Sequence, residues 1–120
     1  MKRVGLVAHD KKKADLIEWS KAHADALRRH ALYATGTTGA GIVAATGLKI
    51  TLLKSGPLGG DAQLGAMIVE GQLDALVFYV DPLTAMPHDV DVKALTRLAT
   101  LYDVLFAVNP ATADAILAAI

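Results

Sequence analysis

The sequence predicts an α/β domain: a three-layer, doubly wound parallel sheet of five strands with helices on both faces. Five short apolar runs without polar alternation are typical of strands that are buried on both faces. Stretches with helical spacing of apolar residues separate these runs, so that strands and helices alternate. No linker, low-complexity segment or repeat interrupts the 120 residues, which predicts a single domain over residues 1–120.

The expected elements alternate in chain order. Strands are expected at residues 4–8, 31–34, 50–53, 75–80 and 105–108. Helices are expected at residues 13–29, 42–46, 62–70, 91–101 and 110–120. Gly47 and Gly71 are suited to ending two of these helices, because glycine tolerates the left-handed conformation found there. Asn109 and Pro110 are a good N-cap and first residue for the last helix.

The composition excludes several classes of protein. Lysine plus arginine equals aspartate plus glutamate at 12 each, so no global field favours nucleic acid or a membrane surface. The apolar runs are too short for a signal peptide or a membrane span. The chain has no cysteine, which removes disulfides and thiolate chemistry and fits a cytoplasmic protein.

The residues with functional chemistry follow the predicted strands. His9 and Asp10 follow the first strand, three threonines the second, a glycine-rich loop the third and Asp81 the fourth. In open α/β sheets, ligands bind outside the carboxyl ends of the strands, where these residues would meet. This convergence predicts one small-molecule site at that edge.

The segment Thr35-Gly36-Thr37-Thr38-Gly39 brings three hydroxyls and two glycines to a helix N-terminus. One threonine there would be an ordinary N-cap, but the combination favours an anion site, since hydroxyls, free N–H groups and the helix dipole suit phosphate. The neighbouring Lys11, Lys12 and Lys13 are either a solvated charge run or, for at least one of them, partners of that anion. No Walker A or G-x-G-x-x-G pattern indicates a nucleoside triphosphate or a dinucleotide.

The loop Ser55-Gly56-Pro57-Leu58-Gly59-Gly60-Asp61 frees the backbone to bring N–H groups close to a ligand. Its last residue, Asp61, has two interpretations. On spacing alone the better one is the N-cap of the next helix, and the other is a catalytic base.

Further carboxylates and imidazoles share this predicted edge. Each could be a cap, turn or loop residue when taken singly; they are Asp10, Asp81, Asp91, His9 and His88. Together with a phosphate cradle they could transfer protons on a small phosphorylated carbonyl compound without a metal. The remaining histidines, His23 and His30, are expected at the surface.

Four ordered motifs on successive strand ends give the sequence a resemblance to methylglyoxal synthase. They are His9-Asp10-x-x-Lys13, Ala34-Thr35-Gly36-Thr37-Thr38-Gly39, Ser55-Gly56-Pro57-Leu58-Gly59-Gly60-Asp61 and Asp81-Pro82-Leu83-x-Ala85-x-Pro87-His88-x-x-Asp91-Val92-Lys93-Ala94-Leu95. The resemblance implies a sheet order of 3-2-1-4-5 and the conversion of dihydroxyacetone phosphate to methylglyoxal and inorganic phosphate, without metal or cofactor. It also implies a homohexamer that phosphate inhibits allosterically.

The resemblance further implies roles for individual residues. Asp61 matches the base that removes a proton from the substrate's hydroxymethyl carbon, and His88 matches the histidine that hydrogen-bonds the substrate oxygens. The carboxylates matched around that site are Asp10, Asp81 and Asp91. The matched phosphate-binding positions are Lys13, Thr35, Gly36, Thr37, Thr38 and Gly56, with His9 and Ser55 close by.

A second interpretation is a sensor domain of the same fold, which binds a phosphorylated metabolite and catalyses nothing. A sensor is normally fused to the enzyme it regulates and has no need for catalytic carboxylates beside a phosphate cradle, so an enzyme is favoured. A purely structural protein does not explain the loops. Family members often continue with a segment that carries a basic residue towards the phosphate site, whereas this sequence ends at Ile120, which leaves phosphate allostery open.

Overall fold

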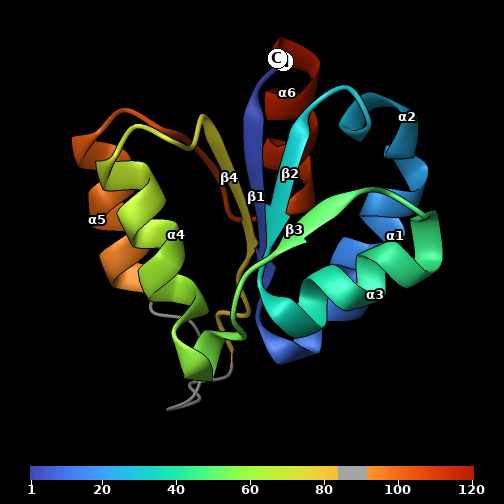
Figure 1. Ribbon diagram of the computed structural model, residues 1–120, viewed down its shortest axis with the longest axis horizontal. Coiled ribbons are helices and arrows are strands. Elements are labelled where there is room, and N and C mark those ends of the chain that lie inside the picture. Colours follow the sequence, from blue (N-terminus) through green and yellow to red (C-terminus); the bar gives the residue numbers. More distant parts are fainter. Residues whose placement is uncertain (84–91) are drawn as a thin grey trace.

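The computed structural model describes residues 1–83 and 92–120, and it contains the expected parallel sheet (Figure 1). Five strands lie in the order β3-β2-β1-β4-β5, and every neighbouring pair is parallel. The strands are β1 (Arg3–Ala8), β2 (Ala31–Ala34), β3 (Ile50–Leu52), β4 (Ala75–Tyr79) and β5 (Leu105–Ala107). The fold class and the strand order expected from the sequence are therefore confirmed.

Helices cover both faces of this sheet. They are α1 (Lys13–Ala22), α2 (Ala24–Leu27), α3 (Gly36–Thr46), α4 (Gly60–Val69), α5 (Val92–Leu101) and α6 (Pro110–Ala119), with short 3-10 turns η1 (Asp10–Lys12) and η2 (Gly56–Leu58). Figure 1 shows α4 and α5 on one side of the sheet and α1, α3 and α6 on the other. Among the described residues, no helix combines the length and the apolarity that crossing a bilayer requires.

The central strand β1 supplies side chains to two separate hydrophobic layers. Leu6 packs in one buried cluster with residues of α1, α2, α3 and α6, among them Leu16 and Ile42. Val7 packs in the other cluster with residues of α4 and α5, among them Leu64. Because side chains alternate across a strand, a continuous apolar run is what a strand covered on both faces requires. The carboxyl ends of the strands are thereby held at one edge.

Several predicted element ends are confirmed. Gly47 and Gly71 have φ angles of 71° and 70°, in the left-handed region where glycine is favoured at helix ends. Asn109 caps α6, because its side-chain oxygen accepts a hydrogen bond from the Thr112 N–H at 2.9 Å. The strand ends differ from the predicted ones by single residues.

The single helix predicted over residues 13–29 is wrong. The chain leaves helical geometry at His23, whose φ and ψ are −113° and 20°, and a second short helix follows. The break places the His23 ring 4.9 Å from the Trp19 ring and its Nε2 3.2 Å from Asp114 of α6. Tertiary contacts thus override a local pattern that would allow one helix.

The helix predicted over residues 42–46 is too short. Thr35 has extended backbone angles and occupies the N-cap position, so α3 begins at Gly36. Residues that look like a turn in the sequence therefore form the first helical turn. The two histidines expected at the surface, His23 and His30, are half-buried.

Candidate functional site

The N-terminus of α3 lies at the carboxyl edge of the sheet, directly after β2. Thr35 and Thr38 are buried there, although threonine is usually exposed. Within the described part of the chain, the Thr38 hydroxyl oxygen has no hydrogen-bond partner. A buried hydroxyl without a partner costs free energy unless a ligand or a water molecule satisfies it. The first-turn amides of Thr37 and Thr38 add further donors, because helix geometry gives them no carbonyl partner within the helix.

Lys13 connects this helix end to the end of β1. Its Nζ lies 2.8 Å from the Thr37 hydroxyl and 2.8 Å from an Asp10 carboxylate oxygen. The Lys13 hydrogen bond and positive charge hold the pKa of the Asp10 carboxyl below its usual range. A cation, a hydroxyl and a helix N-terminus therefore converge on one point, as anion binding requires.

The glycine loop packs directly against this helix end. The Gly36 N–H donates to the Lys54 carbonyl at 3.4 Å, and a Cβ on Gly36 would lie only 3.2 Å from the Leu53 carbonyl oxygen. At Gly60, a Cβ would collide with the Lys54 carbonyl oxygen and lie 2.9 Å from a Thr35 methyl group. Both glycines are therefore needed for close approach between backbones.

The loop backbone is also fixed from within. The Ser55 carbonyl accepts hydrogen bonds from the N–H groups of Leu58 and Gly60, both at 3.0 Å. The Lys54 N–H donates to the Gln63 side-chain oxygen at 2.7 Å. Gln63 thus holds the start of the loop, a role that was not predicted from the sequence. Its position one turn into the following helix, close to the loop, could have indicated this role.

Asp61 lies in the first turn of α4 and is half-buried. The N-cap of that helix is Gly59, with a φ of 106°, and no side chain provides a capping hydrogen bond. The interpretation of Asp61 as an N-cap is therefore wrong. Its carboxylate does gain from the positive end of the helix dipole, which favours an anion at this position.

His9 and Asp81 follow the adjacent strands β1 and β4 and are both buried, with 7% and 8% of their surfaces exposed. The Asp81 backbone N–H donates to His9 Nδ1 at 2.9 Å. Accepting at Nδ1 leaves the proton of a neutral imidazole on Nε2, so His9 presents a hydrogen-bond donor. The Phe78 ring meets the imidazole edge-on at 5.0 Å and holds its plane.

The predicted site residues thus form contacting groups along one edge. One group joins Asp10, Lys13 and Thr37, and another joins the α3 N-terminus to the glycine loop. No hydrogen bond or ion pair within residues 1–83 and 92–120 joins the Asp61 carboxylate to either group. His88 and Asp91 lie outside the described residues.

The fold and this edge define a class: a parallel α/β domain with a lysine, threonine hydroxyls and a helix N-terminus gathered at the carboxyl ends of its strands. Comparison with known proteins identifies the family, since the model of the MGS-like domain matches residues 15–108. The chain belongs to the family of MGS-like domains.

Individual relatives extend the match to nearly the full length. The methylglyoxal synthase of Brucella anthropi is 54% identical over 119 residues, covering 98% of this chain and 95% of that protein. The methylglyoxal synthase of Agrobacterium fabrum is 56% identical over 112 residues, covering 92% of this chain and 88% of its own length. The crystal structure of methylglyoxal synthase from Elizabethkingia anophelis has a TM-score of 0.94 and 50% identity, covering 97% of this chain and 76% of that one. The resemblance drawn from the motifs is confirmed.

Proposed function

We propose that this protein is a methylglyoxal synthase, which converts dihydroxyacetone phosphate to methylglyoxal and inorganic phosphate. The observation that carries the proposal is the position of Lys13, whose ammonium contacts Thr37 at the N-terminus of α3. A cation, hydroxyls and first-turn amides at one point suit a phosphate ester. The relatives that align over nearly the whole chain are named for this reaction.

The phosphate group of the substrate occupies the cradle formed after β1, β2 and β3. Thr37 can accept from Lys13 and donate its own proton to a phosphate oxygen, since a hydroxyl both donates and accepts. The Thr38 hydroxyl, which has no hydrogen-bond partner among residues 1–83 and 92–120, gains an acceptor in the same way. The remaining cradle positions are Thr35, Gly36, Ser55 and Gly56, with His9 beside them.

Asp61 is the base that removes a proton from the hydroxymethyl carbon of the substrate. The electrons of the broken C–H bond form an enediolate, whose oxygens need hydrogen-bond donors because they carry the new charge. The C–O bond to phosphate then breaks, phosphate leaves, and the enol that remains takes up a proton on carbon to give methylglyoxal. His88 is assigned to the substrate oxygens and Asp91, Asp10 and Asp81 to the surrounding carboxylates, by their match to the family motifs.

The homohexamer, the allosteric inhibition by phosphate and the single-domain organisation are further parts of this proposal. Exposed apolar side chains around the edge strand β5 support an oligomer, since they offer an unpartnered surface; they are Leu101, Tyr102, Leu105 and Val108. Light scattering with size-exclusion chromatography measures the assembly directly. The cytoplasmic location stays a prediction.

The decisive experiment incubates the purified protein with dihydroxyacetone phosphate and EDTA and follows methylglyoxal and free phosphate together. Equal release of both products is expected. Glyceraldehyde phosphate as the product would make the protein an isomerase instead. Binding of the substrate without turnover would favour the sensor interpretation and overturn the proposal.

A further inference from the structure

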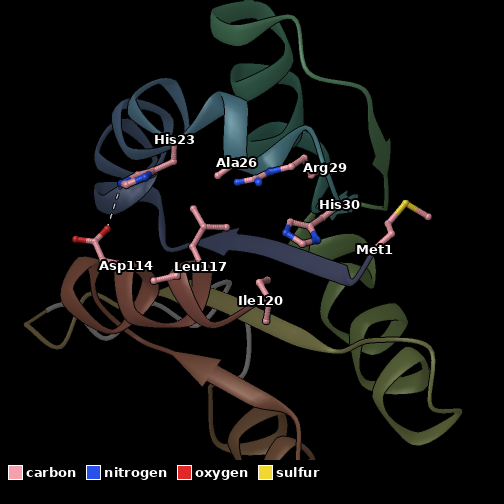
Figure 2. Close-up of a pocket in the computed structure, with 9 residues that line it drawn as sticks. Met1, His23, Ala26, Arg29, His30, Asp114, Leu117 and Ile120 are labelled. Carbon is pink, nitrogen blue, oxygen red and sulfur yellow. Dashed lines mark ion pairs between the residues drawn. The ribbon is translucent and has the colours of Figure 1, made fainter.

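A pocket lies at the amino ends of the strands, opposite the proposed phosphate cradle. It has a volume of about 600 Å³, which is within the usual range for small-molecule sites. Figure 2 shows it between the α2–β2 connection and the C-terminal half of α6. His30 directly precedes β2, so this pocket opens at the amino ends of the strands. Nothing in the proposed reaction uses it.

Arg29 brings an uncommitted positive charge to this pocket. Within the part of the chain that the structure describes, its guanidinium makes no hydrogen bond or ion pair. The neighbouring Arg28 differs, because it pairs with Asp25 at 2.8 Å and does not line this pocket. A guanidinium presents a planar set of donors that matches a carboxylate or a phosphate with two parallel hydrogen bonds.

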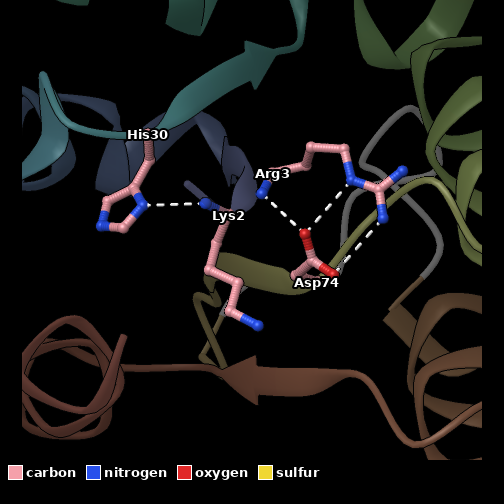
Figure 3. Close-up of polar contacts among 4 residues, drawn as sticks. All are labelled: Lys2, Arg3, His30 and Asp74. Atoms are coloured by element: carbon pink, nitrogen blue, oxygen red, sulfur yellow. Dashed lines mark hydrogen bonds and ion pairs between the residues drawn. The ribbon is translucent and has the colours of Figure 1, made fainter.

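His30 adds a neutral donor beside Arg29. Its Nδ1 accepts the Lys2 backbone N–H at 3.1 Å (Figure 3), which leaves the proton of the neutral ring on Nε2. Burial, followed by the charges of the N-terminal amine and Arg29, lowers the pKa of His30 from its usual value. The imidazole therefore remains an Nε2–H donor at neutral pH.

The side-chain carboxylate that lines the pocket, that of Asp114, already has partners. Asp114 Oδ1 accepts a hydrogen bond from the Trp19 indole N–H at 2.8 Å and lies 3.2 Å from His23 Nε2. Figure 2 shows this pair at the end of the pocket away from His30 and Met1. Between the two ends the lining side chains are apolar and include those of Ala26, Leu117 and Ile120.

We propose that this pocket binds a small organic anion, with its carboxylate or phosphate head on Arg29 and His30 and a compact apolar body against Leu117 and Ile120. The two recognition elements are independent of the phosphate cradle, because they lie at the other edge of the sheet. The proposal therefore stands whether or not the protein catalyses the proposed reaction.

Ligand-detected and histidine side-chain NMR with four probes tests the chemistry. Benzoate and phenylphosphonate carry the two head groups on one apolar body, benzyl alcohol keeps the body without charge, and inorganic phosphate keeps the charge without the body. Benzoate or phenylphosphonate should shift the His30 signals, and the stronger of the two identifies the preferred head. Equal binding of benzyl alcohol would overturn the anion assignment.

Matched variants locate the binding. Arg29→Gln should weaken binding of the preferred probe roughly tenfold or more, the scale of one charge-assisted hydrogen bond. Arg28→Gln, which removes the adjacent but paired arginine, should leave it unchanged. Ala26→Leu, which places a larger side chain in the pocket without altering its charge, should abolish binding of the probe. Loss of binding in Lys13→Ala but not in Arg29→Gln would place the probe in the phosphate cradle and overturn the proposal.

Discussion

The two edges of one sheet differ in how their polar groups are used. At the amino edge, Asp74 accepts from the Arg3 backbone N–H at 2.8 Å and from its guanidinium at 3.2 Å (Figure 3). At the carboxyl edge, the Thr38 hydroxyl is buried without a partner among the described residues, and Lys13 faces the N-terminus of a helix. The Arg3–Asp74 contacts fix the start of β1, whereas the Thr38 hydroxyl is left with a proton to donate to a ligand. The contrast distinguishes polar groups that stabilise the fold from those that are ready for a ligand.

The largest expected effect is at Asp61, the carboxylate that we propose as the catalytic base. Asp61→Asn should lower turnover by roughly 100-fold or more, the usual scale for loss of a general base. The substitution removes the charge and preserves the shape, so the fold should be retained. Steady-state kinetics with thermal unfolding measures both, and near wild-type turnover would remove Asp61 from this role.

The contact between the two loops of the cradle gives the second effect. Gly60→Ala should destabilise the protein by about 1–3 kcal/mol, because the new Cβ meets backbone that has no room to move. Gly65→Ala is the control in the same helix, since its Cβ would meet only side-chain ends among the described residues, Leu98 at 3.1 Å and Leu95 at 4.0 Å. Urea unfolding of both variants makes the comparison, and equal stability would show that the loops can separate.

The cation of the cradle gives the third effect. Lys13→Ala should raise KM for the substrate roughly tenfold with a smaller change in kcat, because the role proposed for the ammonium is to bind the phosphate group of the substrate. Lys12→Ala is the control, since the Lys12 ammonium makes a weak, solvent-exposed ion pair with Asp15, 4.0 Å away. An unchanged KM in Lys13→Ala would exclude this lysine from the cradle.

The smallest effect is at the amino edge and depends on pH. The Arg3 hydrogen bonds hold the pKa of Asp74 below its usual value, so this carboxylate stabilises the fold above its unfolded pKa of about 3.9. Asp74→Asn should cost about 1 kcal/mol at pH 7, a modest figure because the pair is partly exposed. The difference in unfolding free energy between the wild type and Asp74→Asn should vanish as the pH falls through the folded-state pKa of Asp74.

Urea unfolding at neutral and acidic pH tests this assignment. Asp25→Asn is the matched control, because Asp25 pairs with Arg28 on the exposed surface of one helix and should contribute nothing measurable. If Asp74→Asn remains less stable than the wild type at low pH, the stabilisation comes from packing and not from the charge of Asp74.

The sheet could be predicted because each strand is a continuous apolar run, which marks burial on both faces whatever the surroundings. The order of the motifs predicts that their residues lie together at the carboxyl ends of the strands, and the described ones do lie there. The break at His23 could not be predicted, since it depends on Asp114, which lies 91 positions further along the chain. Spacing alone favours a capping role for Asp61, because spacing does not reveal that Gly59 occupies the N-cap position.

The pocket at the amino ends of the strands could not be predicted from the sequence either. Its residues come from the N-terminus, from α2 and the segments on either side of it, and from α6 and the residue after it. None of them forms a motif with its neighbours in the sequence. Only the antiparallel return of α6 along the sheet brings Arg29 and Leu117 to the same cavity. Patterns in sequence report local structure, whereas this cavity results from packing of distant segments.

The close backbone contact at Gly36 and Gly60 has a consequence for motion. Because the start of α3 and the start of α4 pack on the same Lys54 carbonyl, neither helix end can fray without releasing the other. Amide hydrogen exchange should therefore detect them as one cooperative unit, with similar opening free energies despite their separation in the chain. A ligand held by either terminus would slow exchange at both.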